Sequence, residues 1–192
     1  ASKFGKRDCY GTLEKYIYEE TIDKVCVVYG LRRTGKTTLL RQLMLSFSEG
    51  MFSKTAYIKC RTTDTIATLN KDIILLQEKG YKYLFIDEVT LISDFIDSSS
   101  LFSDVYAAQG MKVVLSGTDS LGFNFAINDE LYDRAVMVHT TFIPFKEHSR
   151  LLGINDIDEY IRYGGTLKAG EVDFESNEIN ARDASFRDDE ST

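Results

Sequence analysis

One segment constrains the fold of this chain more than any other: Gly30 to Thr37, which reads GLRRTGKT and fits the pattern G-x-x-x-x-G-K-T at every position. Its two glycines let the backbone curl so that successive N–H groups point inward, where an anion can accept hydrogen bonds. A helix that begins at Lys36 would add the positive end of its dipole at the same place. The sequence therefore predicts a phosphate-binding loop between a strand and a helix.

The residues on either side of the loop have the patterns that such a loop requires. A β-branched run from Lys24 to Gly30 predicts a buried strand, and leucines at helical spacing predict a helix over Lys36 to Phe47. In that setting the Lys36 ammonium reaches the β- and γ-phosphates of a nucleotide, and the Thr37 hydroxyl binds Mg²⁺. The expected nucleotide-binding set comprises Gly30, Leu31, Arg32, Arg33, Thr34, Gly35, Lys36, Thr37 and Thr38.

Strand-like and helix-like runs alternate through the rest of the chain, and this alternation predicts a parallel sheet with crossover helices. Four more strands are expected, at Lys54–Cys60, at Tyr81–Asp87, from Lys112 onward and at Ala135–Ile143. Further helices are expected from a cap at Asp64 to Lys79, at Leu101–Gln109, near Asn128–Asp133, at Phe145–Leu152 and at Ile157–Tyr163.

Two acids, Asp87 and Glu88, end the apolar run that begins at Leu84. The carboxyl ends of parallel strands meet at one edge of a sheet, so this pair should lie near the phosphate-binding loop. Asp87 would then hold Mg²⁺ through water, and Glu88 would polarise the attacking water as a general base. The alternative for Glu88 is an ordinary solvated acid at the start of a loop.

The fourth strand ends in the polar segment Leu115 to Ser120. A hydroxyl here could hydrogen-bond the attacking water or the γ-phosphate and so report which nucleotide is bound. We expect this sensor role for Ser116 or Thr118, without a choice between them. The alternative is turn chemistry, for which these residue types are also typical.

The sequence leaves more than one role open for each of three arginines. Arg32 and Arg33 lie inside the loop, where one of them contacts phosphate, base or a neighbouring segment, or both are plain surface charge. Arg134 precedes the fifth strand and either stabilises charge on the γ-phosphate, in cis or across a subunit interface, or pairs with Asp133 or Glu130.

Charge is unevenly distributed along the chain. The formal net charge is −7, but residues 171–192 hold eight acids and two bases, so the residues before them are nearly neutral. A neutral body offers no general basic field for nucleic acid. No apolar run approaches the roughly 18 to 20 residues that cross a bilayer, and we expect neither a secretory signal nor a membrane partner.

The cysteines and histidines do not form a metal-binding pattern. Cys26 and Cys60 lie in apolar segments, and with Cys9 they make an odd number without paired spacing. We therefore expect buried, reduced thiols and a cytoplasmic location. His139 and His148 are isolated from any cysteine pair, so no zinc site is expected.

With these motifs in place, the chain resembles an AAA-type ATPase of the additional-strand-catalytic-glutamate class. The loop GLRRTGKTT over Gly30–Thr38 is similar to the G-x-R-R-x-G-K-T loop of a large group of prokaryotic ATP-binding proteins. The resemblance spans roughly residues 10 to 166 and extends to Asp87-Glu88, to Ser116–Ser120, to Pro144–Glu147 and to Tyr160–Gly165. It implies an α/β P-loop NTPase, a three-layer sandwich with a central, mainly parallel five-stranded sheet.

The resemblance also implies a division of the chain. Residues 1–23 would form an N-terminal lead-in, 24–144 the ATPase core, 145–166 the start of a helical lid and 167–192 an acidic polar tail. Members of the group usually continue into winged-helix and nuclease-like regions, so any DNA contact would come through such a C-terminal region. Many relatives have Gly-Arg before the last strand, whereas here Arg134 follows Asp133.

The expected activity is Mg²⁺-dependent binding and hydrolysis of ATP, coupled to a conformational change. The expected partners are ATP or ADP, together with a protein partner or a second copy of the chain. One alternative is a nucleotide-dependent switch or scaffold with little hydrolysis. A P-loop kinase is less favoured, because neither an acceptor pocket nor an arginine-bearing lid is apparent. No base-reading N-K-x-D segment occurs, so the sequence does not specify the nucleobase.

Overall fold

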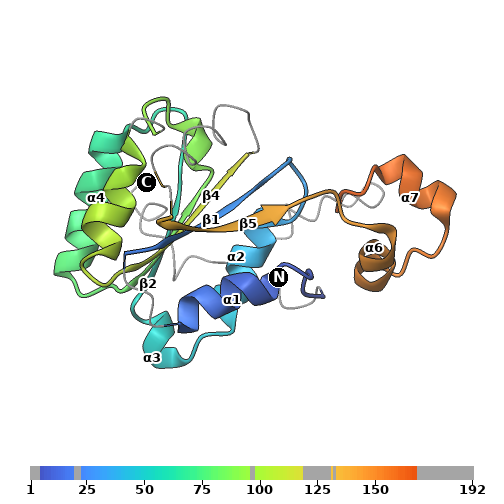
Figure 1. Cartoon of the computed structure of the whole chain (residues 1–192), viewed down its shortest axis with the longest axis horizontal. Helices are drawn as coiled ribbons and strands as arrows, with labels where there is room; N and C mark the ends of the chain where they lie inside the picture. The colour runs from blue at the N-terminus through green and yellow to red at the C-terminus, as the bar shows by residue number, and fades with distance from the viewer. Residues whose placement is uncertain (1–4, 20–22, 96–97, 119–130, 132, 168–192) are drawn as a thin grey trace, which may run out of the picture.

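A sheet of five parallel strands forms the centre of the computed structural model, which describes residues 5–19, 23–95, 98–118, 131 and 133–167 (Figure 1). The strands are β1 (Val25–Gly30), β2 (Thr55–Lys59), β3 (Tyr83–Asp87), β4 (Lys112–Thr118) and β5 (Ala135–Thr140). Their order is β2-β3-β4-β1-β5, and all four pairings are parallel. Because β4 lies between β1 and β3, the sheet has the additional strand expected from the sequence, and the predicted α/β P-loop NTPase fold is confirmed.

The helices connect the strands and cover both faces of the sheet. They are α1 (Tyr10–Tyr18), α2 (Lys36–Leu45), α3 (Glu49–Phe52), α4 (Ile66–Glu78), α6 (Phe145–Leu152) and α7 (Ile157–Tyr163), with the 3-10 turn η1 (Val89–Leu91) and the π-helix η3 (Phe102–Ala107). In Figure 1, α1 and α2 lie on one side of the sheet, α4 lies on the other, and α6 and α7 lie beyond β5. None of the helices in the described part of the chain is long and apolar enough to span a bilayer.

Alternation along each strand divides the core into two layers. In β1, Val25 and Val27 pack into the layer under α4 and η3, whereas Cys26 and Val28 pack into the layer under α1 and α2. Strands buried on both faces read as continuous apolar runs, which explains why β1 shows no polar alternation. The same period of two places Asp87, two residues after Phe85, on the face that α2 covers.

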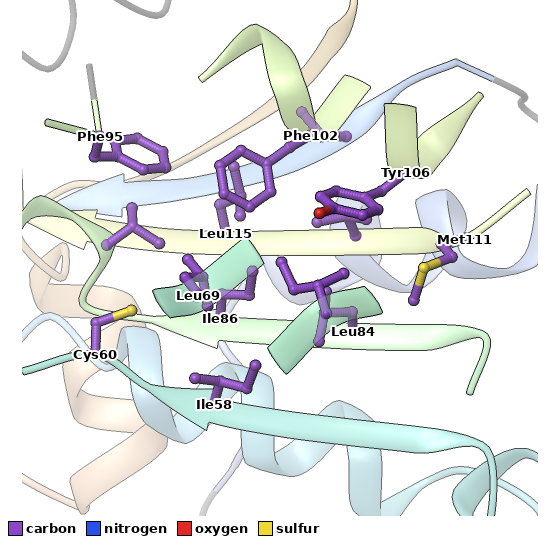
Figure 2. Close-up of a cluster of buried hydrophobic side chains, with 14 of the residues drawn as sticks. Ile58, Cys60, Leu69, Leu84, Ile86, Phe95, Phe102, Tyr106, Met111 and Leu115 are labelled. Carbon is purple, nitrogen blue, oxygen red and sulfur yellow. The ribbon is translucent and has the colours of Figure 1, made fainter. Parts of the chain in front are cut away.

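Aromatic side chains fill much of the layer under η3. Figure 2 shows Phe95, Phe102 and Tyr106 in a row above the aliphatic side chains of the strands, among them Ile86 and Leu115. The Phe95 and Phe102 ring centroids are 5.6 Å apart, and those of Phe102 and Tyr106 are 6.2 Å apart. This tilted stacking fills the space above β4 without a regular α-helix.

Two local predictions are corrected by the structure, and one helix was missed. The segment predicted as a helix over Leu101–Gln109 contains a π-helix, in which the Ala108 N–H bonds to the Ser103 carbonyl oxygen five residues back. The cap of α4 is Thr65, not Asp64, whose carboxylate accepts instead from the Arg61 N–H. The helix α1 was not predicted at all.

The prediction for the cysteines is confirmed, whereas two others fall largely outside the described residues. The two cysteines predicted to be buried thiols, Cys26 and Cys60, are both buried, and neither is in a disulfide. The helix expected near 128–133 falls outside the described residues except for 131 and 133, and the acidic tail lies outside them from residue 168 onward.

Candidate functional site

The phosphate-binding loop leaves β1 at Gly30 and enters α2 after Gly35. Gly35 has φ 90° and is the N-cap of α2, so the left-handed conformation favours glycine there. Gly30 has φ 150°, and a Cβ at this position would collide with the carbonyl and hydroxyl oxygens of Thr140 in β5. Thr34 adds a second contact between the loop and β5, since its hydroxyl lies 2.8 Å from the Thr140 hydroxyl. The curve of the loop is therefore fixed from both ends.

Lys36 lies inside this curve. Its side chain is buried, and its Nζ donates to the carbonyl oxygens of Gly30 at 2.9 Å and Leu31 at 2.8 Å. An ammonium at the positive end of α2 experiences an unfavourable helix dipole, and these two carbonyls offset it. An anion in the loop would offset it more strongly.

The Asp87 carboxylate, at the end of β3, is fully buried and accepts hydrogen bonds on both oxygens. Oδ2 accepts from the Thr37 hydroxyl at 2.8 Å and from the Tyr57 hydroxyl at 2.7 Å. Oδ1 accepts from the Ser116 hydroxyl and from the Glu88 N–H, the latter at 3.1 Å. Three of these donors come from α2, β2 and β4, and the fourth is the N–H of the residue that follows β3, so four segments meet at one carboxylate.

The donor set fits Mg²⁺. A hydroxyl and a carboxylate in contact supply the hard oxygen ligands that this ion prefers. No three side chains of the metal-binding types His, Cys, Asp and Glu gather anywhere in the described part of the chain. That is compatible with Mg²⁺, which is commonly held by one or two protein groups and completes its shell with water and phosphate oxygens. Thr37 and Asp87 are therefore the residues that would hold it.

Glu88 follows Asp87 in a left-handed conformation, with φ 60°. Its side chain is half-buried. Burial, followed by the adjacent charge of Asp87, raises the pKa of Glu88, while the positive charges of Lys36, Arg32 and Lys59 oppose the rise. The acid thus lies among the cations of the loop and of the neighbouring strand, rather than in open solvent.

This combination of loop, buried acid and neighbouring glutamate agrees with the comparison of the sequence with protein families. A family described as AAA domain matches residues 22–149, about two thirds of the chain. The chain belongs to the AAA domain family. No curated protein matches it. Membership places it among the AAA-type P-loop ATPases, a class of nucleotide-binding domains, and agrees with the resemblance found in the sequence.

The AAA domain holds Ser116 and Thr118 in different surroundings. Ser116 is fully buried and contacts Asp87, and its oxygen lies 3.3 Å from the Glu88 nitrogen. Thr118 is half-buried at the end of β4, opposite Gly30 in the sheet, and its N–H donates to the Thr90 hydroxyl at 3.1 Å. Both therefore lie at the edge of the sheet that carries the loop, but only Ser116 contacts the acid pair.

The arginines of the AAA domain separate into two groups. Arg32 and Arg33 are exposed in the loop; Arg33 has φ 65°, and its carbonyl accepts from the Leu167 N–H at 2.9 Å. Arg134 lies at the amino end of β5, the edge opposite the loop, and pairs with Asp104. The structure thus does not bring Arg134 to the loop of its own chain, and its role across a subunit interface stays a prediction.

Two contacts at the site were missed in the sequence. Arg7, before α1, binds both carboxylate oxygens of Glu147 in α6, and its guanidinium also donates to the Thr34 carbonyl at 2.8 Å. Tyr57 contacts Asp87, as described above. Neither carries a local motif: a strand tyrosine reads as core, and Arg7 reads as part of a short basic segment.

A pocket opens beside the loop of the AAA domain, on the α6 side. The N-terminal segment, the loop, the start of α2, the end of α6 and the segment after α7 all contribute to it. Its walls are mainly apolar. They are formed by Gly5, Arg7, Gly35, Thr38, Leu39, Gln42, Leu151, Leu152 and Leu167.

Proposed function

We propose that this AAA domain binds Mg²⁺·ATP at the Gly30–Thr37 loop and hydrolyses it, and that the reaction changes the position of α6 and α7. The observation that carries the proposal is the contact between Thr37 and Asp87 beside the buried Lys36. A hydroxyl at a helix N-terminus, a carboxylate and a lysine converge where a nucleotide would place its β- and γ-phosphates.

The residues divide the work by their chemistry. Lys36 exchanges its two carbonyl partners for phosphate oxygens, and the loop N–H groups donate to the same phosphates. Glu88, whose pKa is raised by burial, accepts the proton of the attacking water as a general base. Ser116, the better placed of the two sensor candidates, links Asp87 to the Glu88 backbone. When bound, Mg²⁺ supplies neutralisation of phosphate charge.

The pocket on the α6 side suits the base of the nucleotide. Leu39 from α2, Leu151 from α6 and Leu167 supply apolar walls, while Gly35 belongs to the phosphate-binding loop itself. A base in this pocket would contact α6 and the segment after α7 together. Nucleotide binding and the position of these segments are thereby coupled.

A nucleotide-dependent switch with little hydrolysis is the second candidate. The placement of Arg134 favours it, because this arginine pairs with Asp104 at the far edge of the sheet. Without an arginine from a neighbouring molecule, the charge that develops on the γ-phosphate would be less well stabilised. In this case the bound nucleotide, rather than its turnover, sets the state of the domain.

The test is a panel of ATP, ADP, GTP and GDP, with Mg²⁺ or with EDTA, in which both affinity and phosphate release are measured. Wild type should bind an adenine nucleotide with Mg²⁺ and release phosphate from ATP. Lys36→Ala should weaken ATP binding at least about 100-fold, because it removes the cation that faces the phosphates. Lys71→Ala, on the exposed face of α4, is the matched control and should bind like wild type.

The outcomes separate the readings. Unchanged ATP affinity in Lys36→Ala would remove the phosphate-binding assignment altogether. Tight binding with negligible phosphate release would favour the switch. Preference for a guanine nucleotide would leave the loop assignment in place and reject ATP as the substrate.

A further inference from the structure

Tyr57 reaches the acid of the candidate magnesium site from a strand that carries none of the recognised motifs. It lies in β2 opposite Phe85 of β3, and its side chain is almost fully buried in the layer under α2. Its hydroxyl nevertheless donates to Asp87 Oδ2 at 2.7 Å. A buried tyrosine usually finds a hydrogen-bond partner, but here the partner is the expected ligand of the metal.

Asp87 determines the direction in which the Tyr57 hydroxyl donates its hydrogen bond. An ionised carboxylate can only accept, so the Tyr57 hydroxyl directs its one proton toward Asp87 Oδ2.

The two side chains that donate to Asp87 Oδ2, Thr37 and Tyr57, differ in whether they are themselves expected to bind Mg²⁺. The Thr37 hydroxyl also donates to Oδ2, at 2.8 Å, but is itself an expected ligand of Mg²⁺. A bound ion would take a lone pair of the Thr37 hydroxyl, so this group would serve the ion and Asp87 together. The Tyr57 hydroxyl also donates to Oδ2 but is not itself an expected ligand of Mg²⁺, so its proton is available to Asp87 alone.

We propose that Tyr57 is a positioning residue of this site, which holds the Asp87 carboxylate in the orientation that receives Mg²⁺ together with the nucleotide. The proposal rests on the proposed function, since it needs Asp87 to serve a metal. Outer-shell partners of metal ligands typically contribute about 10- to 100-fold to metal affinity. We expect the lower end for Tyr57, because Ser116 and the Glu88 N–H still hold the other oxygen.

The test removes the hydroxyl and leaves the ring. In Tyr57→Phe, the affinity for a fluorescent ADP analogue is measured as a function of Mg²⁺ concentration, and again in EDTA. We expect half-maximal enhancement of binding at about 10-fold higher Mg²⁺ than in wild type. Affinity in EDTA should stay within about twofold of wild type, because the loop contacts are intact.

Tyr83→Phe is the matched control. Tyr83 lies at the other end of β3 and packs against the Phe47 ring, with centroids 5.5 Å apart. It loses the same atom from the same layer and should leave the Mg²⁺ dependence unchanged. Thermal unfolding of both variants verifies that each is folded at the temperature of the binding measurement.

A double-mutant cycle with Asp87→Asn tests whether the effect passes through the acid. Tyr57→Phe should change the Mg²⁺ dependence of wild type but add little to that of Asp87→Asn, since the group it positions has already been altered. Additive effects would overturn the proposal, as would a Tyr57→Phe variant with wild-type Mg²⁺ dependence. An equal loss of affinity in EDTA would also overturn it, in favour of a purely structural role.

Failure of the proposed function gives a different result. In that case wild type itself shows no enhancement of nucleotide binding by Mg²⁺, and this result overturns both the proposed function and the positioning role of Tyr57. Enhancement in wild type that Tyr57→Phe retains in full rejects Tyr57 alone and leaves the nucleotide site standing.

Discussion

Asp87 illustrates how much of this site depends on single hydrogen bonds. Its carboxylate is fully buried, and a buried charge is tolerated only where donors satisfy it. The hydroxyls of Thr37, Tyr57 and Ser116 and the N–H of Glu88 supply those donors. The acid is thus oriented before any ligand arrives, and binding does not have to order it.

Glu88→Gln should separate binding from hydrolysis. The amide keeps the size of the side chain but cannot accept a proton from water, so turnover should fall at least about 100-fold while Mg²⁺·ATP affinity stays close to wild type. Phosphate release and equilibrium binding, measured on the same preparation, check both halves of the prediction.

Glu78→Gln is the control for this substitution, because Glu78 ends α4 on the exposed surface. It should match wild type in both measurements. Hydrolysis by Glu88→Gln at the wild-type rate would show that Glu88 is not the base, while loss of nucleotide affinity would assign it a binding role instead.

At this scale, sequence reasoning found the residues that carry motifs. Lys36, Thr37 and Asp87 were expected together because spacing in the chain implies the same edge of a parallel sheet, and the structure brings them together. Tyr57 and Arg7 were not found, because their partners lie 30 and 140 residues away in the chain. Only packing shows such contacts.

Among the elements, the strands followed most directly from the sequence. Apolar, β-branched runs such as Val25–Gly30 have few alternatives in a chain with helix-like segments between them. Their order was not predicted, because periodicity carries no information on it and the resemblance to a known class implied only an additional strand. The helix α1 was missed although Leu13 and Ile17 lie on one face, since no side chain caps its start at Cys9.

The π-helix η3 could not have been predicted from the pattern of apolar residues in its sequence. A π-helix and an α-helix accept the same residue types, and the difference lies in the widened turn that seats Phe102 and Tyr106 over the strands (Figure 2). The widened turn suits the rings of the layer rather than any local preference. Neighbours distant in the chain thus decide the type of helix.

Thr65→Ala should test the start of α4. The Thr65 hydroxyl accepts from the Thr68 N–H, and the Thr68 hydroxyl accepts from the Thr65 N–H, so both residues cap the helix. Loss of the first bond should lower the free energy of unfolding by about 0.5–2 kcal/mol in urea titrations. Thr63→Ala, in the exposed loop before the cap, should cost less than about 0.5 kcal/mol. Equal costs at the two positions would reject the capping box.

At the scale of the whole molecule, the Arg7–Glu147 pair connects the N-terminal segment and α6 at the phosphate-binding loop. Arg7 is 7% exposed and Glu147 is 5% exposed, so the pair is buried, and Arg7 also holds the Thr34 carbonyl of the loop. The N-terminal segment, the loop and α6 therefore share one guanidinium. Movement of α6 away from the loop has to break this contact or carry it along.

Removing either partner should be costly. Arg7→Met or Glu147→Leu leaves an unpaired buried charge and should lower the free energy of unfolding by about 3–5 kcal/mol. The double variant removes both charges, and its cost should fall short of the sum of the single costs by at least about 1 kcal/mol. Denaturant titrations of the four proteins give these values.

Arg150→Met serves as the control for the pair. Arg150 of α6 contacts the Asp8 carboxylate at 2.7 Å and so links the same two segments, but through exposed side chains. Its loss should cost no more than about 1 kcal/mol. A comparable cost for Arg7→Met, or full additivity in the double variant, would show that the buried pair is not coupled.

The pair should also give stability a dependence on pH. Burial alone would raise the pKa of Glu147, but the hydrogen bonds from Arg7 and from the Asp8 N–H outweigh it, and the pKa is lowered overall. The contribution is therefore complete above the ordinary glutamate value and is lost as pH falls through the lowered one. Between about pH 5 and about pH 3, wild type should lose more stability than the Arg7→Met/Glu147→Leu variant. Parallel pH profiles would contradict this assignment.

During synthesis from the N-terminus, β1 leaves the ribosome before either of its neighbours exists. Its partners β4 and β5 end at Thr118 and Thr140, whereas β1 is complete at Gly30. The neighbouring pair β2 and β3 can form much earlier, because both strands are complete by Asp87. An apolar strand with both edges open is prone to pairing with other chains. The nascent chain therefore passes through a period in which β1 is exposed and unpaired. Chaperones that cover short apolar segments would bind β1 during that period.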